Sequence, residues 1–376
     1  MDDVSSVLVP HAASPVEWWY VEGRLALADG TTRAIMIAVF RGPLRAETPA
    51  MAFVAVHEEA SRNVHRRSVI SPGMIAFMED AINRVGAREL PDVMLRIGKH
   101  AFRRIARARA ADGLVVAATE ATFVPSPFHF EWQGIELRED KTGIALRFEA
   151  AGCVYDLTLH PDAPWSDLPR QAIPVNLGIA GYRSCPRVSV SGDANGAALT
   201  GSVWFDRQWG DESQIVSVLD ERVVLNGWDW FAINLENGVD LMLYQPRNLR
   251  SGASMPGFGT LWTSRGWQPL GAEFSATPFA HIRSRTTGHR YPTAWGLDVP
   301  EVGIALRINA EANGEIPVYG PMGWNWQSPV NVEGSMNGDA VKGSGWLELN
   351  GYGYPLAARA QLRFWTAYLR SLFTHR

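Results

Sequence analysis

An acidic residue lies beside two tryptophans in the segment Glu17-Trp18-Trp19-Tyr20, near the start of the chain. If this segment is a β-strand, Trp18 and Tyr20 point to one face while Glu17 and Trp19 point to the other. Core packing is one interpretation of the aromatic residues. A second interpretation places Glu17 on a pocket wall, where loss of solvent would raise its pKa. We therefore select Glu17 as a candidate catalytic acid and Trp19 as a candidate substrate contact.

A second acidic residue follows a tryptophan in the segment GSVWFDRQWGDE, residues 201–212. A strand here would carry Trp204, Asp206 and Gln208 on one face. A carboxyl group that stays neutral can donate a proton, and a neighbouring indole tolerates apolar or cationic carbon. The alternative is a contact of Asp206 with an arginine or with the main chain. We select Asp206 and Trp204 as catalytic candidates and Gln208 as a substrate-binding candidate.

Further tryptophans occur in pairs that are separated by one polar residue. Trp228 and Trp230 form one pair, with Tyr244 in the strand expected to follow, and Trp324 and Trp326 form another. A single pair is usually part of a core. Several pairs in a chain with 15 tryptophans favour a cavity lined by aromatic side chains. All five residues are therefore candidates for substrate binding.

The composition limits the classes of function. A net charge of −4 over 376 residues lacks the basic surplus of a nucleic-acid-binding protein. The two cysteines, Cys153 and Cys185, are too few for a disulfide scaffold, and the nine histidines show no metal-ligand spacing. No Gly-x-Ser-x-Gly elbow occurs. We expect no metal and no nucleic-acid partner, and the oligomeric state stays open.

The start of the chain bears on where the protein acts. The segment MDDVSSVLVPHAASP begins with acidic residues and lacks a long apolar core, so no signal peptide is predicted. No run of about 18 apolar residues occurs, so no membrane-spanning helix is predicted. We expect a cytoplasmic protein, with membrane association as an open alternative.

Short segments rich in β-branched and aromatic residues, joined by turn sequences such as ENG at 236–238, predict an antiparallel sandwich or barrel. Helical periodicity is strong at residues 92–109 and 356–373, and residues 73–85 predict a shorter helix. The clearest expected strands span residues 33–40, 142–150, 154–160, 199–206, 228–235 and 239–245.

The order of these segments predicts two β units. The first spans residues 1–164 and contains a helical insert at about 58–113. The second spans residues 175–355 and is followed by a C-terminal helix at 356–376. The segment HPDAPWSDLPRQAIP, residues 160–174, is expected to link the two units.

Five segments in this order resemble landmarks of the carotenoid 1,2-hydratase/AttH-like family, also called the lipocalin-like hydroxyneurosporene synthase family. They are HAASPVEWWYVEGRL, RSCPRVSVSG, GSVWFDRQWG, WDWFAINLENGVDLMLYQPR and GSGWLELNGYG. The resemblance implies a mainly β fold of two lipocalin-like antiparallel β-barrel domains, with the cavity at or between them. It also implies large apolar unsaturated substrates, isoprenoids or polyenes, that are transformed without a metal or organic cofactor.

The resemblance bears on one residue in particular. Hydratases of the family donate a proton from the aspartate of a Tyr-x-Asp pattern, which Trp204-Phe205-Asp206 matches with tryptophan in place of tyrosine. Their upstream His-x-Trp pair has no histidine counterpart in the segment IPVNLGIAGYRS. The resemblance therefore implies that Asp206 is the proton donor, and it leaves hydration, cyclisation and isomerisation open.

Three functions follow from these observations. The first is an enzyme of the lyase or isomerase class, a hydratase or cyclase, in which Asp206 protonates a double bond. Trp204, Trp228 and Trp230 would stabilise the resulting cation. The second is a pericyclase that needs shape but no proton donor. The third is a lipid-binding protein without chemistry.

The expected helix at residues 92–109 is amphipathic, with a narrow apolar stripe and a basic side. Basic amphipathic helices bind anionic headgroups, whereas a narrow stripe favours packing on the protein. We expect the stripe to pack on the first barrel and the basic side to face outward near the cavity mouth. The outward residues would be Arg96, Lys99, Arg103 and Arg107.

Overall fold

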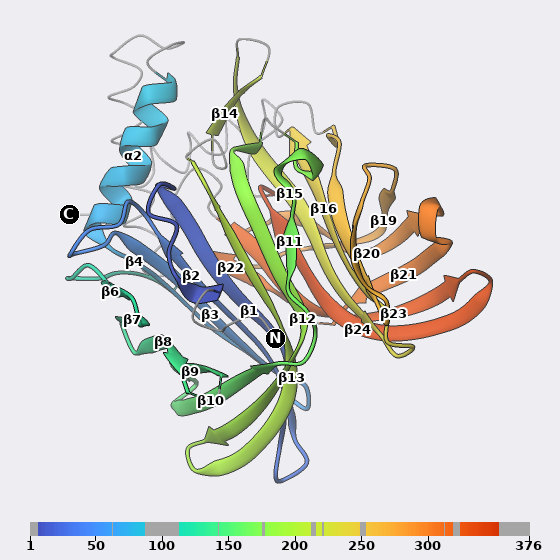
Figure 1. The fold of residues 1–376 in the computed structure, drawn as a ribbon, viewed down its shortest axis with the longest axis horizontal. Coiled ribbons are helices and arrows are strands. Elements are labelled where there is room, and N and C mark those ends of the chain that lie inside the picture. Colours follow the sequence, from blue (N-terminus) through green and yellow to red (C-terminus); the bar gives the residue numbers. More distant parts are fainter. Residues whose placement is uncertain are drawn as a thin grey trace.

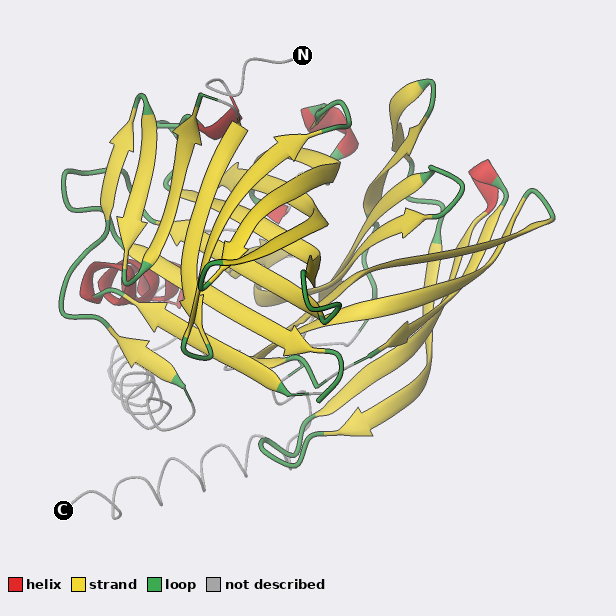
Figure 2. Ribbon diagram, turned by 90° about the horizontal axis from the view of Figure 1, so that it is seen from below, coloured by secondary structure: helices red, strands yellow, loops and turns green. Residues whose placement is uncertain are grey.

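Two curled β-sheets make up most of the protein (Figures 1 and 2). The computed structural model describes residues 7–61, 63–86, 113–141, 143–174, 177–211, 216–219, 222–248, 253–311, 313–318 and 324–352. The predicted mainly β fold of two lipocalin-like halves is confirmed. Paired strands are antiparallel throughout the described residues, except for the short parallel pair of β4 (Val64–Ile70) and β5 (Leu114–Val116).

The first sheet has 13 strands, in the order β5-β4-β3-β2-β1-β13-β12-β10-β9-β8-β7-β6, with β11 paired to β12. Its remaining strands are β1 (Val16–Leu27), β2 (Thr32–Arg41), β3 (Ala50–Glu58), β6 (Thr122–Pro125), β7 (Phe128–Trp132), β8 (Ile135–Asp140), β9 (Gly143–Ala150), β10 (Cys153–Pro161), β11 (Ser166–Leu168), β12 (Ile179–Ala194) and β13 (Ala197–Gly210).

The second sheet has 11 strands, in the order β18-β17-β16-β15-β24-β23-β21-β20-β19, with β14 paired to β15 and β22 to β23. They are β14 (Val216–Leu219), β15 (Arg222–Leu235), β16 (Asp240–Asn248), β17 (Phe258–Thr263), β18 (Gly266–Leu270), β19 (Ser275–Arg283), β20 (Arg290–Val299), β21 (Ile304–Ala310), β22 (Glu315–Pro317), β23 (Trp324–Met336) and β24 (Asp339–Asn350). The helices are α2 (Pro72–Gly86) and the short 3-10 helices η2 (Arg170–Ala172) and η5 (Pro300–Val302).

Three clusters of buried apolar side chains follow from this arrangement. One lies within the first sheet and includes Trp19 and Phe128, and another lies within the second sheet and includes Trp326. The third draws on both sheets, for example Trp204 from β13 and Trp230 from β15. Burial of aromatic surface between the sheets therefore holds the two halves together.

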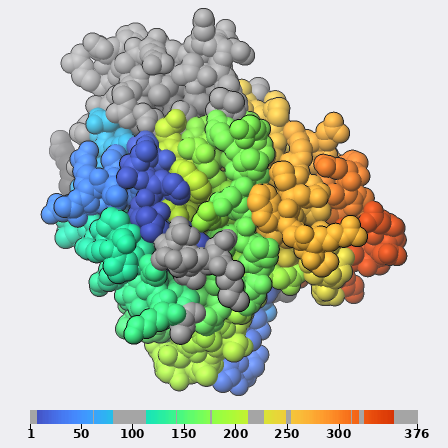
Figure 3. All heavy atoms as spheres, in the orientation of Figure 1, coloured from blue at the N-terminus to red at the C-terminus, as the bar shows by residue number. Residues whose placement is uncertain are grey.

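Polar contacts at the edge of this interface add to the apolar packing. The Arg187 Nε atom donates to the Asp240 Oδ2 atom at 2.9 Å, and the Asn234 Nδ2 atom donates to the Pro186 carbonyl oxygen at 2.9 Å. The space-filling view in Figure 3 shows the green residues of the first sheet in contact with the orange residues of the second.

Several predicted elements are present close to their expected bounds. The helix expected at 73–85 is α2, the strand expected at 33–40 is β2, and the strand expected at 142–150 is β9. The turn ENG joins β15 to β16 as expected, and Gly238 adopts φ 86°, a conformation that glycine accepts without strain.

The sheet boundary differs from the predicted division at 164–175. Strands β12 and β13 belong to the first sheet, because β12 pairs with β10 and β13 pairs with β1. The segment at 160–174 is not a linker between sheets, since it contains β11, which pairs with β12. The sheets divide after Gly210 instead. Proline-rich composition indicates a loop, but long-range strand pairing decides to which sheet the next strand belongs.

The helices expected at 92–109 and 356–373 lie outside the described residues. Within the described part of the chain, no helix has both the length and the apolar character needed to cross a membrane.

Candidate functional site

A cavity lies where the two sheets meet, beside α2. Its volume is about 110 Å³, far more than the roughly 10–15 Å³ that one water needs. The lining residues come from both halves and include no lysine or arginine in the described chain. They are Val16, Trp18, Tyr20, Phe40, Met51, Phe53, Met74, Phe77, Met78, Tyr182, Asp206, Gln208, Trp228, Trp230, Tyr244, Val318, Asn325, Glu348 and Asn350.

Strand alternation explains how β1 and β13 supply the first wall. On β1, Trp18 and Tyr20 share the face that looks toward the second sheet. Asp206 is the cross-strand partner of Tyr20, and Gln208 is the partner of Trp18. Side chains on opposed residues of neighbouring strands lie side by side, so the register places Asp206 in the row that lines the cavity.

Asp206 is 3% exposed and receives two hydrogen bonds. The Trp204 Nε1 atom donates to Oδ1 at 2.6 Å, and the Tyr182 hydroxyl donates to Oδ2. The Trp230 Nε1 atom donates to the Tyr182 hydroxyl oxygen at 2.7 Å, which fixes that hydroxyl in place. The carboxyl group is therefore held from two sides at the cavity wall.

Burial raises the pKa of Asp206 to about 7. The charge of Glu348 raises it further, whereas the hydrogen bonds from Tyr182 and Trp204 favour the carboxylate and limit the rise. A group with this pKa is present in both protonation states near neutral pH, which suits proton donation followed by proton acceptance.

Glu22 is a second buried acid beside Asp206. It lies opposite Trp204 in the β1–β13 pair and is 1% exposed. Neither of its carboxyl oxygens has a hydrogen-bond partner among the described residues. Burial raises its pKa well above the usual value, and the charges of Asp206 and Glu348 raise it further. Both effects favour the neutral form of Glu22 over its carboxylate.

Glu348 on β24 is the third acid of the group. Its Oε1 atom accepts from Asn325 Nδ2 at 3.0 Å and from Trp228 Nε1 at 3.2 Å. Burial raises its pKa, and these two donors oppose the rise. Three acids from both sheets thus share one buried region, and no basic side chain is on the cavity lining. Each charge that forms there makes the next ionisation more costly.

The structure brings together half of the ten residues selected from the sequence. Asp206, Gln208, Trp228, Trp230 and Tyr244 all line the cavity. The alternative for Asp206 was a contact with an arginine or with the main chain. The structure instead gives this carboxyl group the side chains of Tyr182 and Trp204 as hydrogen-bond donors.

Trp204 lies behind Asp206 rather than on the lining itself. It packs edge-on against Trp230, with ring centroids 6.3 Å apart. Its contribution to the site is the hydrogen bond to Asp206, so it positions the acid.

Trp19 does not line the cavity. It faces the core of the first sheet, where its ring lies 5.3 Å from that of Phe128. Trp326 packs in the second core, with Tyr291 at 4.7 Å. Trp324 is buried but is also absent from the lining. The alternation was predicted correctly for Trp19, but the face chosen for the pocket was the wrong one.

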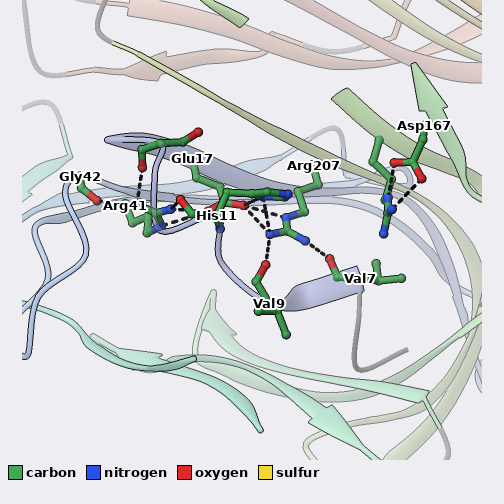
Figure 4. A network of polar contacts seen from close by, with 10 residues as sticks. Val7, Val9, His11, Glu17, Arg41, Gly42, Asp167 and Arg207 are labelled. Atoms are coloured by element: carbon green, nitrogen blue, oxygen red, sulfur yellow. Dashed lines mark hydrogen bonds and ion pairs between the residues drawn. The ribbon is translucent and has the colours of Figure 1, made fainter. Parts of the chain in front are cut away.

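Glu17 also lies on the opposite face of β1, in a network of polar contacts (Figure 4). Its Oε2 atom lies 2.5 Å from Arg41 Nη2, and its Oε1 atom lies 2.5 Å from Arg207 Nη2. Burial alone would raise the pKa of Glu17. A hydrogen bond with His11 and the charges of both arginines outweigh burial and lower it. The predicted raised pKa and the role as a catalytic acid are therefore wrong.

Three residues of the site were not predicted from the sequence, namely Glu22, Glu348 and Tyr182. Glu22 shares the β1 face with Tyr20, so strand period alone could have marked it as a neighbour of Trp18 and Tyr20. Tyr182 and Glu348 show no local signal, because each reaches the site only through long-range pairing of its strand.

No cluster of three or more histidine, cysteine or acidic residues in the described chain has a geometry that could hold a metal ion.

The chain is similar to one protein family and to several solved structures. A family model described as AttH-like matches residues 95–352. A crystal structure assigned as AttH from Nitrosomonas europaea is similar at 21% identity and a TM-score of 0.65, covering 94% of this chain and 97% of that one. Kievitone hydratase from Nectria haematococca is similar at 11% identity and a TM-score of 0.60, covering 93% and 91%. No curated protein matches the chain.

Proposed function

This chain belongs to the AttH-like family, and from that premise we propose that it is an enzyme that protonates a carbon–carbon double bond of an apolar unsaturated substrate. One observation carries the proposal. A buried aspartate with a pKa of about 7 lies on the wall of an aromatic cavity, held by Tyr182 and Trp204. An acid that is half protonated near neutral pH can both give and recover a proton in one cycle.

The reaction begins with transfer of the Asp206 proton to one carbon of the double bond. The O–H bond breaks, a C–H bond forms, and the neighbouring carbon becomes a cation. The rings of Trp228 and Trp230 line the cavity and stabilise a cation over their faces. The Asp206 carboxylate is left on the wall as the base for the second step.

Two outcomes complete the cycle. Water attack on the cation forms a C–O bond, and the surplus proton returns to Asp206, which gives net hydration. Attack by a second double bond of the same substrate forms a ring, and loss of a proton to Asp206 gives a cyclic isomer. The relative of similar fold that is named a hydratase makes hydration the first outcome to test.

Isotope incorporation tests the proposal. A panel of prenylated and polyene compounds is incubated with the protein in D2O and, separately, in H2-18O. Hydration places one deuterium and one 18O in the product, and cyclisation places deuterium without 18O. A pericyclic reaction incorporates neither isotope, and a binding protein yields no product. Either of the last two results would overturn the proposal.

Asp206→Asn keeps the shape of the side chain but removes its proton. We expect product formation to fall by about 100- to 10,000-fold, the usual contribution of a general acid. Asp229→Asn is the matched control, because Asp229 is also buried with a raised pKa but pairs with Arg247, outside the lining. Retained activity in Asp206→Asn, or an equal loss in the control, would contradict the role of Asp206.

A further inference from the structure

The two walls of the cavity differ in chemistry. The wall from β2, β3 and α2 carries Phe40, Phe53, Met74 and Met78 and is apolar. The wall from β23 and β24 carries Asn325, Glu348 and Asn350 and is polar. A substrate that fills the space therefore meets oxygen and nitrogen atoms from β23 and β24, and only carbon and sulfur from the side chains of β2, β3 and α2.

Most polar atoms of this second wall already have partners. Asn325 donates to Glu348 at 3.0 Å, and its Oδ1 atom accepts from the main-chain nitrogen of Trp326 at 3.0 Å. These bonds fix the Asn325 amide and orient Glu348. Asn325 therefore supports the wall and has little capacity left for a ligand.

Asn350 is the exception. Its main-chain carbonyl oxygen accepts from Arg247, which anchors the residue at the end of β24. The residue is 7% exposed, and its Oδ1 atom has no hydrogen-bond partner among the described residues. A buried acceptor without a donor is costly, so a group that donates to it gains affinity from this atom.

We propose that the wall of Asn350 and Glu348 binds a hydroxyl group of the substrate, so that the substrate is an apolar unsaturated alcohol or phenol rather than a hydrocarbon. A hydroxyl can donate to the Asn350 Oδ1 atom, which a hydrocarbon or an ether cannot do. With a hydrocarbon bound, this acceptor would be buried without a donor. A site that hydrogen-bonds a hydroxyl group therefore binds the analogue that lacks the hydroxyl much more weakly.

The neighbouring acids decide between a hydroxyl and an amine as the donor. An ammonium group in this cavity would lie close to Asp206, Glu22 and Glu348 and would favour their ionised forms. Asp206 would then lose the proton that the reaction needs. A neutral hydroxyl leaves the protonation of Asp206 intact, so this inference rests on the proposed function.

The apolar wall suits the rest of such a substrate. Met74 and Met78 come from α2 and are buried, and Phe77 lies between them in sequence on the same lining. Methionine side chains adapt to irregular chains of carbon atoms. The hydroxyl end would therefore face β24 while the hydrocarbon body extends toward α2, with its double bond alongside Asp206.

Calorimetric titration of the full chain with matched probes tests the inference. The probes are farnesol, farnesyl methyl ether, farnesene and farnesylamine, which share one carbon skeleton. We expect farnesol to bind at least about tenfold more tightly than the ether and the hydrocarbon, the effect of one buried unpaired acceptor. Farnesylamine reports on the acids instead, because its affinity should rise with pH as they ionise, whereas the affinity of farnesol should not. Equal affinities of farnesol, the ether and the hydrocarbon would overturn the inference.

Variants of Asn350 and Glu348 test whether these side chains cause the preference for farnesol over farnesene. Asn350→Leu has nearly the same size without the acceptor and should abolish the preference for farnesol over farnesene. Glu348→Gln should reduce that preference at least about threefold and serves as a second variant if Asn350→Leu does not fold. Asn331→Leu, at an exposed position of β23, is the matched control and should keep the preference. An unchanged preference in both cavity variants would contradict the assignment.

Failure of this inference is distinguishable from failure of the proposed function. Asp206→Asn should keep the preference for farnesol while losing product formation. If isotope incorporation depends on Asp206 but the protein does not prefer farnesol over farnesene, the proposed hydroxyl site is wrong and the proposed proton transfer is retained. If the preference is present and no product incorporates deuterium, the hydroxyl site stands and the proton transfer is wrong.

Discussion

The two faces of the β1–β13 pair bury acids of opposite behaviour. On one face, Glu17 is 0% exposed and contacts Arg41 and Arg207, and its pKa is lowered. On the other face, Glu22 and Asp206 are almost equally buried, and both pKa values are raised. The same two strands thus hold an acid with a lowered pKa on one side and two acids with raised pKa values on the other.

The difference shows that burial alone does not set the charge of an acid. Burial raises the pKa in all three cases. On the Glu17 face, two buried guanidinium groups provide the compensating charge, and Arg41 is the direct cross-strand partner of Glu17. On the cavity face the neighbours of each acid are other acids and aromatic rings. The first arrangement is typical of structural ion pairs, and the second is typical of sites that move protons.

The sharpest test makes the same substitution on each face of β1. Glu17→Gln should lower the free energy of unfolding by about 3–5 kcal/mol, because it leaves two buried arginines without their partner. Glu22→Gln should change it by less than about 1 kcal/mol at pH 7, because the neutral acid and the amide have similar shape and charge. Urea unfolding of both variants measures the two values.

The unsubstituted protein is the reference for both variants, and the slope with denaturant should stay unchanged if both unfold in the same way. A loss in Glu22→Gln as large as that in Glu17→Gln would mean that Glu22 is ionised and paired, and the contrast between the faces would be lost.

The second test uses the pH dependence of stability. Asp206 has a pKa of about 7 in the folded protein and about 4 when unfolded. The folded state therefore binds more protons between these values, so that stability falls as the pH rises through this window. Asp206→Asn should remove about 2–3 kcal/mol of the decline between pH 5 and pH 8. The measurement is urea unfolding at each pH.

For Glu17 we expect the opposite change of stability with pH, at acidic pH rather than near pH 7. Its pKa is lowered in the folded protein, so its contribution is present above the unfolded pKa and is lost as the pH falls through the folded value. Glu17→Gln should therefore leave the decline between pH 5 and pH 8 in place. A decline that persists unchanged in Asp206→Asn would assign it to another group.

The smallest expected effect concerns the hydrogen bond from Tyr182 to Asp206. Tyr182→Phe removes a donor that favours the carboxylate and should raise the pKa of Asp206 further. The variant should therefore lose about 1 kcal/mol more stability at pH 8 than at pH 5, since the bond is stronger when Asp206 is charged. Infrared absorption of the protonated carboxyl group, followed with pH, measures the shift directly.

Tyr155→Phe provides a control, because Tyr155 is a buried tyrosine of the first core, away from the cavity. Its effect should not depend on the protonation of Asp206. If Tyr182→Phe costs the same at both pH values, the tyrosine holds the site by packing rather than by stabilising the charge.

Part of the site follows from local sequence. The alternation of side chains along a strand predicted that Trp204, Asp206 and Gln208 share a face. The tryptophan pairs indicated an aromatic cavity, and Trp228 and Trp230 line it. These features involve residues two positions apart, and the geometry of a single strand is enough to place such residues on the same face. The hairpin at Glu236-Asn237-Gly238 belongs to the same class.

Other features depend on pairing between distant strands. Local sequence offers two acids on β1, Glu17 and Glu22, and does not say which one will be neutral. The choice is made by Arg41 from β2 and Arg207 from β13, which reach only the Glu17 face. Similarly, Trp18 and Trp19 are adjacent residues of the same type, so the sequence does not tell which of them faces the cavity. The second sheet covers only the face of β1 that carries Trp18.

The sequence by itself therefore determined the strand class, the hairpins, the rows of side chains on each strand and the placement of Asp206 next to an indole. The tertiary structure alone decided which face of β1 meets the second sheet, and it brought Tyr182 and Glu348 to Asp206 from strands far along the chain. The physical reason is that strand alternation acts over a few residues, whereas the pKa of a buried acid depends on charges and donors that long-range pairing delivers.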